Sequence, residues 1–183
     1  HDPRVQNAVP LMGFDNYFAY YQILKAMNRR YPDLDLHDNF MVVSPDEGAM
    51  TRNIYYASVL GVDLGMFFKR RDYTKVINGR NPIIAHEYIG GSVEGKNIFV
   101  ADDIIATGDS VIKLAKELKE KGANKIFLSA TFPLFTEGVE KFNKAHEEGL
   151  FEAVISTNLT YRIPELKDCD WFIESDMSKY IGY

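Results

Sequence analysis

The sequence predicts an α/β fold in which a mostly parallel, twisted sheet carries helices on both of its faces. Short apolar runs typical of buried strands alternate along the chain with segments whose apolar residues recur at helical spacing, which indicates βαβ units. Right-handed crossovers between parallel strands then distribute the helices over both faces. The chain has 183 residues, of which 46% are hydrophobic, so we expect a single domain, 1–183, with a complete core.

The first expected elements are a helix, a strand and a second helix. Segment 13–33 predicts a helix, because its aromatic and aliphatic residues recur at helical spacing, and Asp15 is the expected N-cap. The run 39–44 predicts a short buried strand that ends before a proline. Segment 47–61 predicts the second helix, with Gly61 in the C′ position that favours a left-handed backbone.

A strand, a polar segment and another strand follow. The apolar run 62–68 predicts a strand. Segment 69–82 holds five basic residues against one acid, and its Asn-Gly and Asn-Pro pairs indicate a loop. The run 83–89 predicts a further strand, and the small residues that open 90–97 predict a turn.

The second half of the chain continues the alternation. Its expected elements are a strand at 98–103, a helix at 110–122, a strand at 125–132, a helix at 138–149, and strands at 152–158 and 170–175. Ligands of doubly wound sheets bind at the carboxyl ends of strands, near a change in strand order. We therefore expect a ligand site where the strand 98–103 ends.

Charge and cysteine content exclude several functional classes. With 21 basic and 26 acidic residues the net charge is −5, which argues against a nucleic-acid partner. The single cysteine, Cys169, can form neither an internal disulfide nor a thiolate metal cluster, which favours a reducing, cytoplasmic location. No apolar run approaches the roughly 20 residues of a membrane span, and no signal peptide is visible, so we expect no membrane partner.

The stretch after the central strand has the residues of a sugar-phosphate site. The expected helix N-terminus near Ser110 offers unpaired N–H groups and roughly half a positive charge, which suits a phosphate. Gly108 lets the main chain approach an anion, and Thr107 adds a hydroxyl donor. Asp102 and Asp103 can accept hydrogen bonds from paired sugar hydroxyls or bind Mg²⁺.

The alternative is an acidic strand end followed by an ordinary helix cap, with Ser110 or Asp109 as the capping residue. From spacing alone the two interpretations stay open. Asp109 affects both interpretations, because its carboxylate would repel a phosphate bound beside it. Its side chain must therefore point away from the ligand or serve as the cap.

The stretch "FVADDIIATGDS" resembles the phosphoribosyl pyrophosphate-binding motif of the type I phosphoribosyltransferase fold. The segments "VVSPDEGAMTRNIYYASVLG", "FFKRRDYTK" and "SVEGKNIFVADDIIATGDS" are similar, in that order, to the C-terminal half of ribose-phosphate pyrophosphokinases. The resemblance covers nearly the whole chain. It implies a phosphoribosyltransferase-like domain, 1–183, that forms the C-terminal part of a longer two-domain synthetase.

The resemblance implies transfer of the diphosphoryl group of ATP to the 1-hydroxyl of ribose 5-phosphate. The implied substrate-binding residues are Asp102 and Asp103, at the ribose, and the loop Ala106, Thr107, Gly108, Asp109 and Ser110, at the 5-phosphate. Many relatives carry an acid at the place of Ala106 and Gly at the place of Asp109. A ligand contact from the side chain at 106 is therefore not implied here, whereas the main-chain cradle is.

Further roles follow from the same resemblance. Lys69 and Arg71 match a catalytic basic pair at the root of a loop, 69–82, that covers the active site. Asp46 and His1 match metal ligands, and the expected ion is Mg²⁺. The expected partners are ribose 5-phosphate, ATP and further copies of the same chain.

Three alternative functions stay open at this point. A phosphoribosyltransferase acting on a nucleobase would need a hood over the base, and no segment suggests one. A non-catalytic regulator would keep the ligand loop without catalysis, which the pair Lys69 and Arg71 argues against. An unrelated doubly wound nucleotide binder would carry GxGxxG or GxxxxGK[ST], and neither pattern occurs.

Overall fold

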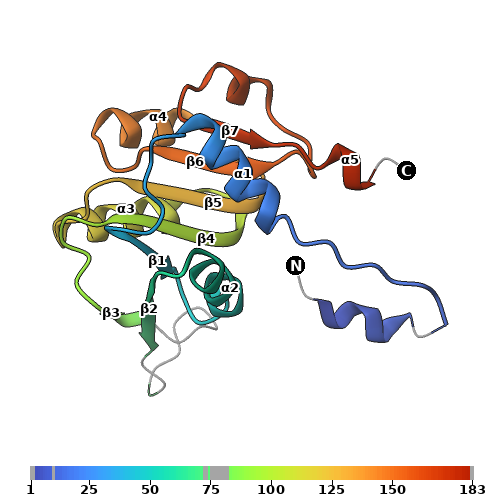
Figure 1. Ribbon diagram of the computed structural model, residues 1–183, viewed down its shortest axis with the longest axis horizontal. Coiled ribbons are helices and arrows are strands. Elements are labelled where there is room, and N and C mark those ends of the chain that lie inside the picture. The colour runs from blue at the N-terminus through green and yellow to red at the C-terminus, as the bar shows by residue number, and fades with distance from the viewer. Residues whose placement is uncertain (1–2, 10, 72–73, 75–82, 182–183) are drawn as a thin grey trace.

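The computed structural model describes residues 3–9, 11–71, 74 and 83–181. These residues form a seven-stranded sheet in the order β3-β2-β1-β4-β5-β6-β7 (Figure 1). The strands are β1 Phe40–Ser44, β2 Asp63–Arg71, β3 Ile83–Ile89, β4 Asn97–Ile105, β5 Ile126–Pro133, β6 Ala153–Thr157 and β7 Phe172–Ser175. The pair β2–β3 is antiparallel and all other neighbouring pairs are parallel, which confirms the predicted mostly parallel α/β sheet.

Helices cover both faces of this sheet. The described helices are α1 Tyr20–Arg30, α2 Met50–Leu60, α3 Asp109–Glu120, α4 Glu140–Glu147 and α5 Ser178–Ile181, with 3-10 turns η1 Pro3–Ala8 and η2 Pro164–Asp168. The buried apolar residues of α1 and α2 belong to one hydrophobic cluster, and those of α3 and α4 belong to another. Within the described ranges, no helix has the length and apolar character that a membrane crossing requires.

Strand β4, at the centre of the sheet, contributes to both clusters. Ile98 and Val100 pack with α3 and α4, whereas Phe99 and Ala101 pack with α1 and α2. This alternation follows from the two-residue period of a strand, and it makes β4 apolar on both faces. The carboxyl end of β4 is consequently fixed from both sides, which suits a strand that carries site residues.

Helix α1 begins later than the sequence predicts. It starts at Tyr20, so the expected N-cap at Asp15 is wrong, and no side-chain cap bond is present at its start. Residues Tyr17 and Phe18 are 60% and 56% exposed, whereas Met27 is fully buried. A short helix is stabilised mainly by packing of its apolar face. Tyr17 and Phe18 stay largely exposed, although the Phe18 ring stacks on Tyr20 at 4.9 Å, and the helix does not extend to them.

Strand β2 runs further than expected. The sequence predicts that the strand ends at residue 68, but β2 continues through Arg71 because its backbone pairs with β3 in an antiparallel hairpin. The basic side chains do not prevent this pairing, which uses main-chain groups only. Apart from Thr74, the predicted covering loop beyond Arg71, up to residue 82, lies outside the described residues. The helix end at Gly61 is confirmed, with φ of 67°.

Candidate functional site

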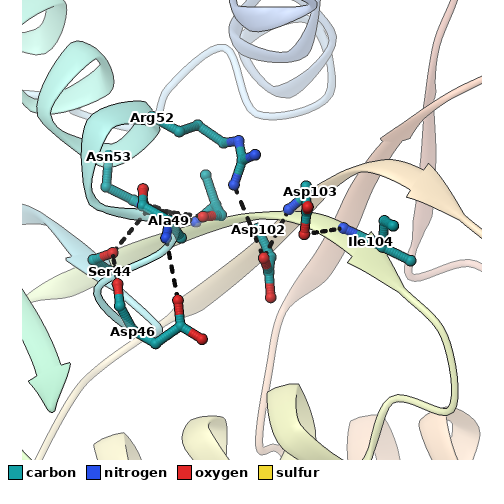
Figure 2. A network of polar contacts seen from close by, with 9 residues as sticks. Ser44, Asp46, Ala49, Arg52, Asn53, Asp102, Asp103 and Ile104 are labelled. Carbon is teal, nitrogen blue, oxygen red and sulfur yellow. Dashed lines mark hydrogen bonds and ion pairs between the residues drawn. The ribbon is translucent and has the colours of Figure 1, made fainter. Parts of the chain in front are cut away.

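Asp102 and Asp103 lie in β4, in the centre of the sheet. The sequence predicts that they close the strand, but β4 continues to Ile105 because its backbone keeps pairing with β5. The register places Asp102 opposite Ala130 and Ile104 opposite Phe132. Strand β1 is the other neighbour of β4, and it ends just before Asp46, so two parallel strands bring their acids to one edge (Figure 2).

The carboxyl group of Asp102 is partly buried among other acids. Its side chain is 32% exposed, and it accepts a hydrogen bond from the backbone N–H of Asp103 at 2.8 Å. Burial is the main cause that raises the pKa of Asp102 to about 6. A side-chain hydrogen bond with Asp103 and the charges of Asp103 and Asp46 act in the same direction, whereas the hydrogen bond from the Asp103 N–H acts against them. Near pH 6 this group therefore divides between its neutral and its charged form.

Arg52 faces Asp102 from helix α2 (Figure 2). Its Nη1 lies 3.9 Å from Asp102 Oδ1, and its side chain is only 16% exposed. The same Nη1 atom is buried and has no hydrogen-bond partner among the residues that the structure describes. Buried N–H donors normally have acceptors, so an unpaired donor beside Asp102 is unusual. Arg52 is not among the candidates predicted from the sequence, although its place in the first turn of the helix after β1 puts it at the carboxyl edge of a parallel sheet.

Asn53 fixes α2 to the sheet beside Arg52. Its Nδ2 donates to the carbonyl oxygens of Ala49 and Ala101 at 2.9 Å and 2.7 Å, and its Oδ1 accepts from the N–H of Ala101 at 3.1 Å. Asn53 is fully buried, and its Nδ2 also lies 3.3 Å from Ser44 Oγ at the end of β1. This amide thus joins β1, α2 and β4, and it sets the position of Arg52 over Asp102 (Figure 2).

The loop between β4 and α3 has the backbone of an anion cradle. Gly108 has φ of +87°, and a Cβ at this position would lie 2.2 Å from the ring of Phe142. Only glycine fits here, for conformational and steric reasons together. Helix α3 begins at Asp109 without a side-chain cap at Gly108, so its first N–H groups keep the partial positive charge of a helix start.

The capping interpretation of this loop is wrong for the two residues that it named. Neither Asp109 nor Ser110 is the N-cap of α3, which is Gly108. The hydroxyl of Thr107 instead donates to Asp109 Oδ2 at 2.9 Å and accepts a long hydrogen bond from the Asp109 N–H at 3.4 Å. Ala106 and Ser110 are exposed beside it.

Asp109 directs its charge toward helix α4. Its Oδ1 accepts a hydrogen bond from Lys141 Nζ at 2.7 Å, and Lys141 also contacts Glu137 Oε2 at 2.6 Å. The hydrogen bond from Lys141, followed by that from Thr107, holds the pKa of Asp109 below its ordinary value. The Asp109 side chain thus points away from the start of α3, as a bound phosphate would require, and no pattern in the sequence indicates its partner Lys141.

The remaining candidate residues lie around the same edge or outside the described residues. Strand β2 is parallel to β1, whose last pair joins Ser44 to Met66, so Lys69 and Arg71 lie beyond the carboxyl end of β1. Asp46 Oδ1 accepts a hydrogen bond from the Ala49 N–H at 3.1 Å. The predicted metal ligand His1 lies outside the described residues. Among the residues that are described, no three or more His, Cys, Asp or Glu side chains converge on one point.

Comparisons with known proteins define the class. Residues 15–146 match the phosphoribosyl transferase domain, and the chain therefore belongs to the phosphoribosyl transferase domain family. The phosphoribosylpyrophosphate synthetase of Mycobacterium smegmatis has the same fold, with a TM-score of 0.64 and 24% identity over 87% of this chain and 47% of that one. An adenine phosphoribosyltransferase also shares the fold, with a TM-score of 0.50 and 18% identity over 75% of this chain and 76% of that one.

The relatives found by sequence share one name, which is narrower than the fold class. The ribose-phosphate pyrophosphokinase of Ralstonia nicotianae is 34% identical over 81% of this chain and 42% of its own length. The protein of the same name from Chlorobaculum tepidum is 31% identical over 86% of this chain and 44% of its own length. The chain thus spans rather less than half the length of these curated relatives.

Proposed function

We propose that this chain is the ribose 5-phosphate-binding part of a ribose-phosphate pyrophosphokinase, which transfers the diphosphoryl group of ATP to the 1-hydroxyl of ribose 5-phosphate. The observation that carries the proposal is the succession along β4 and α3 of a half-buried carboxyl, a glycine loop and an uncapped helix start. A ligand with a diol at one end and a phosphate at the other matches this succession. The names of the sequence relatives support the same conclusion.

In the proposed complex the helix start binds the 5-phosphate and the strand acids bind the sugar. The backbone N–H groups of the loop Ala106, Thr107, Gly108, Asp109 and Ser110 donate to phosphate oxygens. Asp102 and Asp103 accept from the ribose hydroxyls. Arg52 donates from the opposite side to an oxygen of the ligand, which supplies the acceptor that its buried Nη1 lacks.

Lys69 and Arg71 have the proposed catalytic role. Diphosphoryl transfer spreads negative charge over the moving group, and cations directed at that charge lower the barrier. Both residues belong to the part of β2 that extends past the end of β1, on the edge of the sheet where Asp102 lies. A Lys69→Ala variant of the full-length protein should lose most of its turnover, whereas a non-catalytic regulator would be indifferent to the change.

Mg²⁺ is the proposed cofactor, with Asp46 and His1 as its ligands. The oxygen donors of Asp46 suit this ion, because Mg²⁺ takes one or two carboxylates and completes its octahedron with water and substrate phosphates. A site without three converging acids is therefore compatible with Mg²⁺. When bound, the ion would neutralise phosphate charge. Asp46 would hold it beside Asp102, whose pKa responds to the charge of Asp46.

Calorimetric titration of ribose 5-phosphate in the presence of Mg²⁺ tests the proposal directly. Wild-type protein should bind the sugar phosphate, and Asp102→Asn should bind it clearly more weakly, because the variant loses a charged acceptor for the diol. Equal affinities would remove Asp102 from the site. A product assay with ATP in one arm, and nucleobases with phosphoribosyl pyrophosphate in the other, separates the synthetase from a phosphoribosyltransferase.

We also propose that the protein acts as a homo-oligomer in the cytoplasm. Large apolar side chains before and within α1 are exposed to an unusual degree, among them Leu11 at 99%, Met12 at 71% and Tyr21 at 64%. In Figure 1 the segment before α1 extends away from the sheet. Exposed apolar surface of this kind is typical of subunit contacts. Light scattering should give a mass that is a multiple of the chain mass.

A further inference from the structure

We propose that Lys141 is a positioning residue for ribose 5-phosphate binding, because it holds the carboxylate of Asp109 on the α4 side of the phosphate loop. This inference rests on the proposed function and deepens it. The acid at 109 stands where an anion would bind, and its charge must be turned aside before the loop can take a phosphate. Lys141 is the residue placed to do so.

The contact itself is close and charged on both sides. Lys141 Nζ lies 2.7 Å from Asp109 Oδ1 and 2.6 Å from Glu137 Oε2. The lysine side chain is 27% exposed, whereas that of Asp109 is 71% exposed. The pKa of Lys141 is raised, first by its hydrogen bond to Asp109 and next by that to Glu137, as expected for a cation shared by two acids.

The flank of the loop that faces α4 is already occupied by the protein. The carbonyl oxygen of Ile105 accepts hydrogen bonds from the N–H groups of Leu134 and Phe135, at 2.9 Å and 3.2 Å. The carbonyl oxygen of Ala106 accepts from Thr136 at 3.0 Å. The strand-to-helix segment before α4 thus binds one edge of the loop, and Asp109 is directed toward this same edge. The opposite edge is left for the ligand.

A released Asp109 side chain would interfere with a phosphate in two ways. It would place a second negative charge beside the anion, which weakens binding by direct repulsion. It would also compete with the phosphate for the N–H donors of the helix start, because a carboxylate in the first turn of a helix is attracted to the free N–H groups there. Lys141 supplies the cation that prevents both effects, and the Thr107 hydroxyl, which donates to Asp109 Oδ2 at 2.9 Å, holds the same carboxylate without a charge of its own.

The test measures ribose 5-phosphate affinity of the full-length protein by calorimetry, at low and at high salt. Lys141→Met should weaken binding about threefold to fivefold at low salt, in the range of partly exposed charge interactions. The loss should shrink at high salt, because ions screen exposed charges. Adding Asp109→Asn to Lys141→Met should restore affinity to the wild-type value or above it, since the unshielded charge is then gone.

The matched control is Lys144→Met. Lys144 lies on the same helix, is 78% exposed, and pairs with Glu148 at 3.9 Å rather than with the loop. This variant removes the same charge from α4 and should leave ribose 5-phosphate affinity unchanged. Equal melting temperatures for the variants would show that the affinity differences arise from the loop and not from loss of fold.

Three results would overturn the inference. The first is a Lys141→Met affinity equal to that of the wild type, and the second is a loss no larger than that of Lys144→Met. The third is a double variant as weak as Lys141→Met, which would mean that Lys141 acts on the phosphate directly. In each case wild-type binding of ribose 5-phosphate leaves the proposed function standing. Failure of the folded wild-type protein to bind the sugar phosphate overturns both.

Discussion

At the residue scale, Asp102 shows that ligand binding and stability oppose each other at this site. The carboxyl is more easily protonated in the folded chain, with a pKa of about 6, than in the unfolded chain, where it is about 3.9. A group whose pKa is raised by folding contributes stability below the unfolded value, and this contribution is lost as the pH rises through the folded value. At neutral pH the charged Asp102 therefore weakens the fold.

The change Asp102→Asn should make the protein more stable at pH 7.5 while it weakens ribose 5-phosphate binding. We expect a gain on the order of 1 kcal/mol in the free energy of unfolding, after allowance for solvent screening. The gain should vanish near pH 4, because the wild-type carboxyl is then neutral as well. Denaturant unfolding at both pH values measures it. A variant that is less stable than wild type at pH 7.5 would contradict this origin of the raised pKa.

Sequence reasoning at this scale found the residues that are neighbours along the chain. The candidates from Asp102 to Ser110 come from one strand, one loop and one helix start, and their proximity follows from contiguity. Arg52 and Lys141 reach the same edge from α2 and α4, and no pattern near them in the sequence indicates which carboxylates they contact. Their positions become evident only when the order of the strands is known.

At the scale of elements, the contact between the phosphate loop and α4 determines what position 108 can hold. The positive φ of Gly108 and the ring of Phe142 exclude a side chain independently. Gly108→Ala should therefore lower the free energy of unfolding by about 1–3 kcal/mol, through backbone strain and a displaced ring. Thermal unfolding and ribose 5-phosphate titration should both be affected.

A second variant separates the two causes at position 108. Adding Phe142→Leu to Gly108→Ala makes room for the new methyl group but leaves the backbone strained. If the Phe142 ring displaces the loop in Gly108→Ala, the double variant should regain part of the lost ribose 5-phosphate affinity. This gain should exceed any change in affinity that Phe142→Leu causes on its own. A Gly108→Ala variant with wild-type affinity would show that the loop tolerates a shift, and the proposed cradle would lose its geometric basis.

The existence and order of the elements were predictable from the sequence, but several boundaries were not. The alternation of strands and helices is strong, because both faces of β4 and its neighbours are buried. The end of β4 does not follow from the sequence, because the acidic residues suggest a strand end although backbone pairing with β5 continues past them. The start of α1 does not follow either, because the periodic aromatic residues extend beyond the surface on which a helix can pack.

At the scale of the whole molecule, the length of the relatives bears on activity. The chain covers 42% and 44% of the two ribose-phosphate pyrophosphokinases compared above. We expect the 183-residue chain to bind ribose 5-phosphate but to form little phosphoribosyl pyrophosphate from ATP. Binding by calorimetry and product formation by chromatography, on the same preparation, measure the two properties. Turnover equal to that of the full-length protein would refute the expectation.

The closeness of Asp46 and Asp102 should couple the binding of a metal ion, of the sugar phosphate and of protons at this edge of the sheet. The negative charge of Asp46 contributes to the raised pKa of Asp102. A divalent cation that settles on Asp46 cancels that charge, so its uptake should expel a proton from Asp102 at mildly acidic pH. By reciprocity, binding of the ion and binding of the sugar phosphate should each raise the affinity for the other, and protonation of Asp102 should lower both affinities.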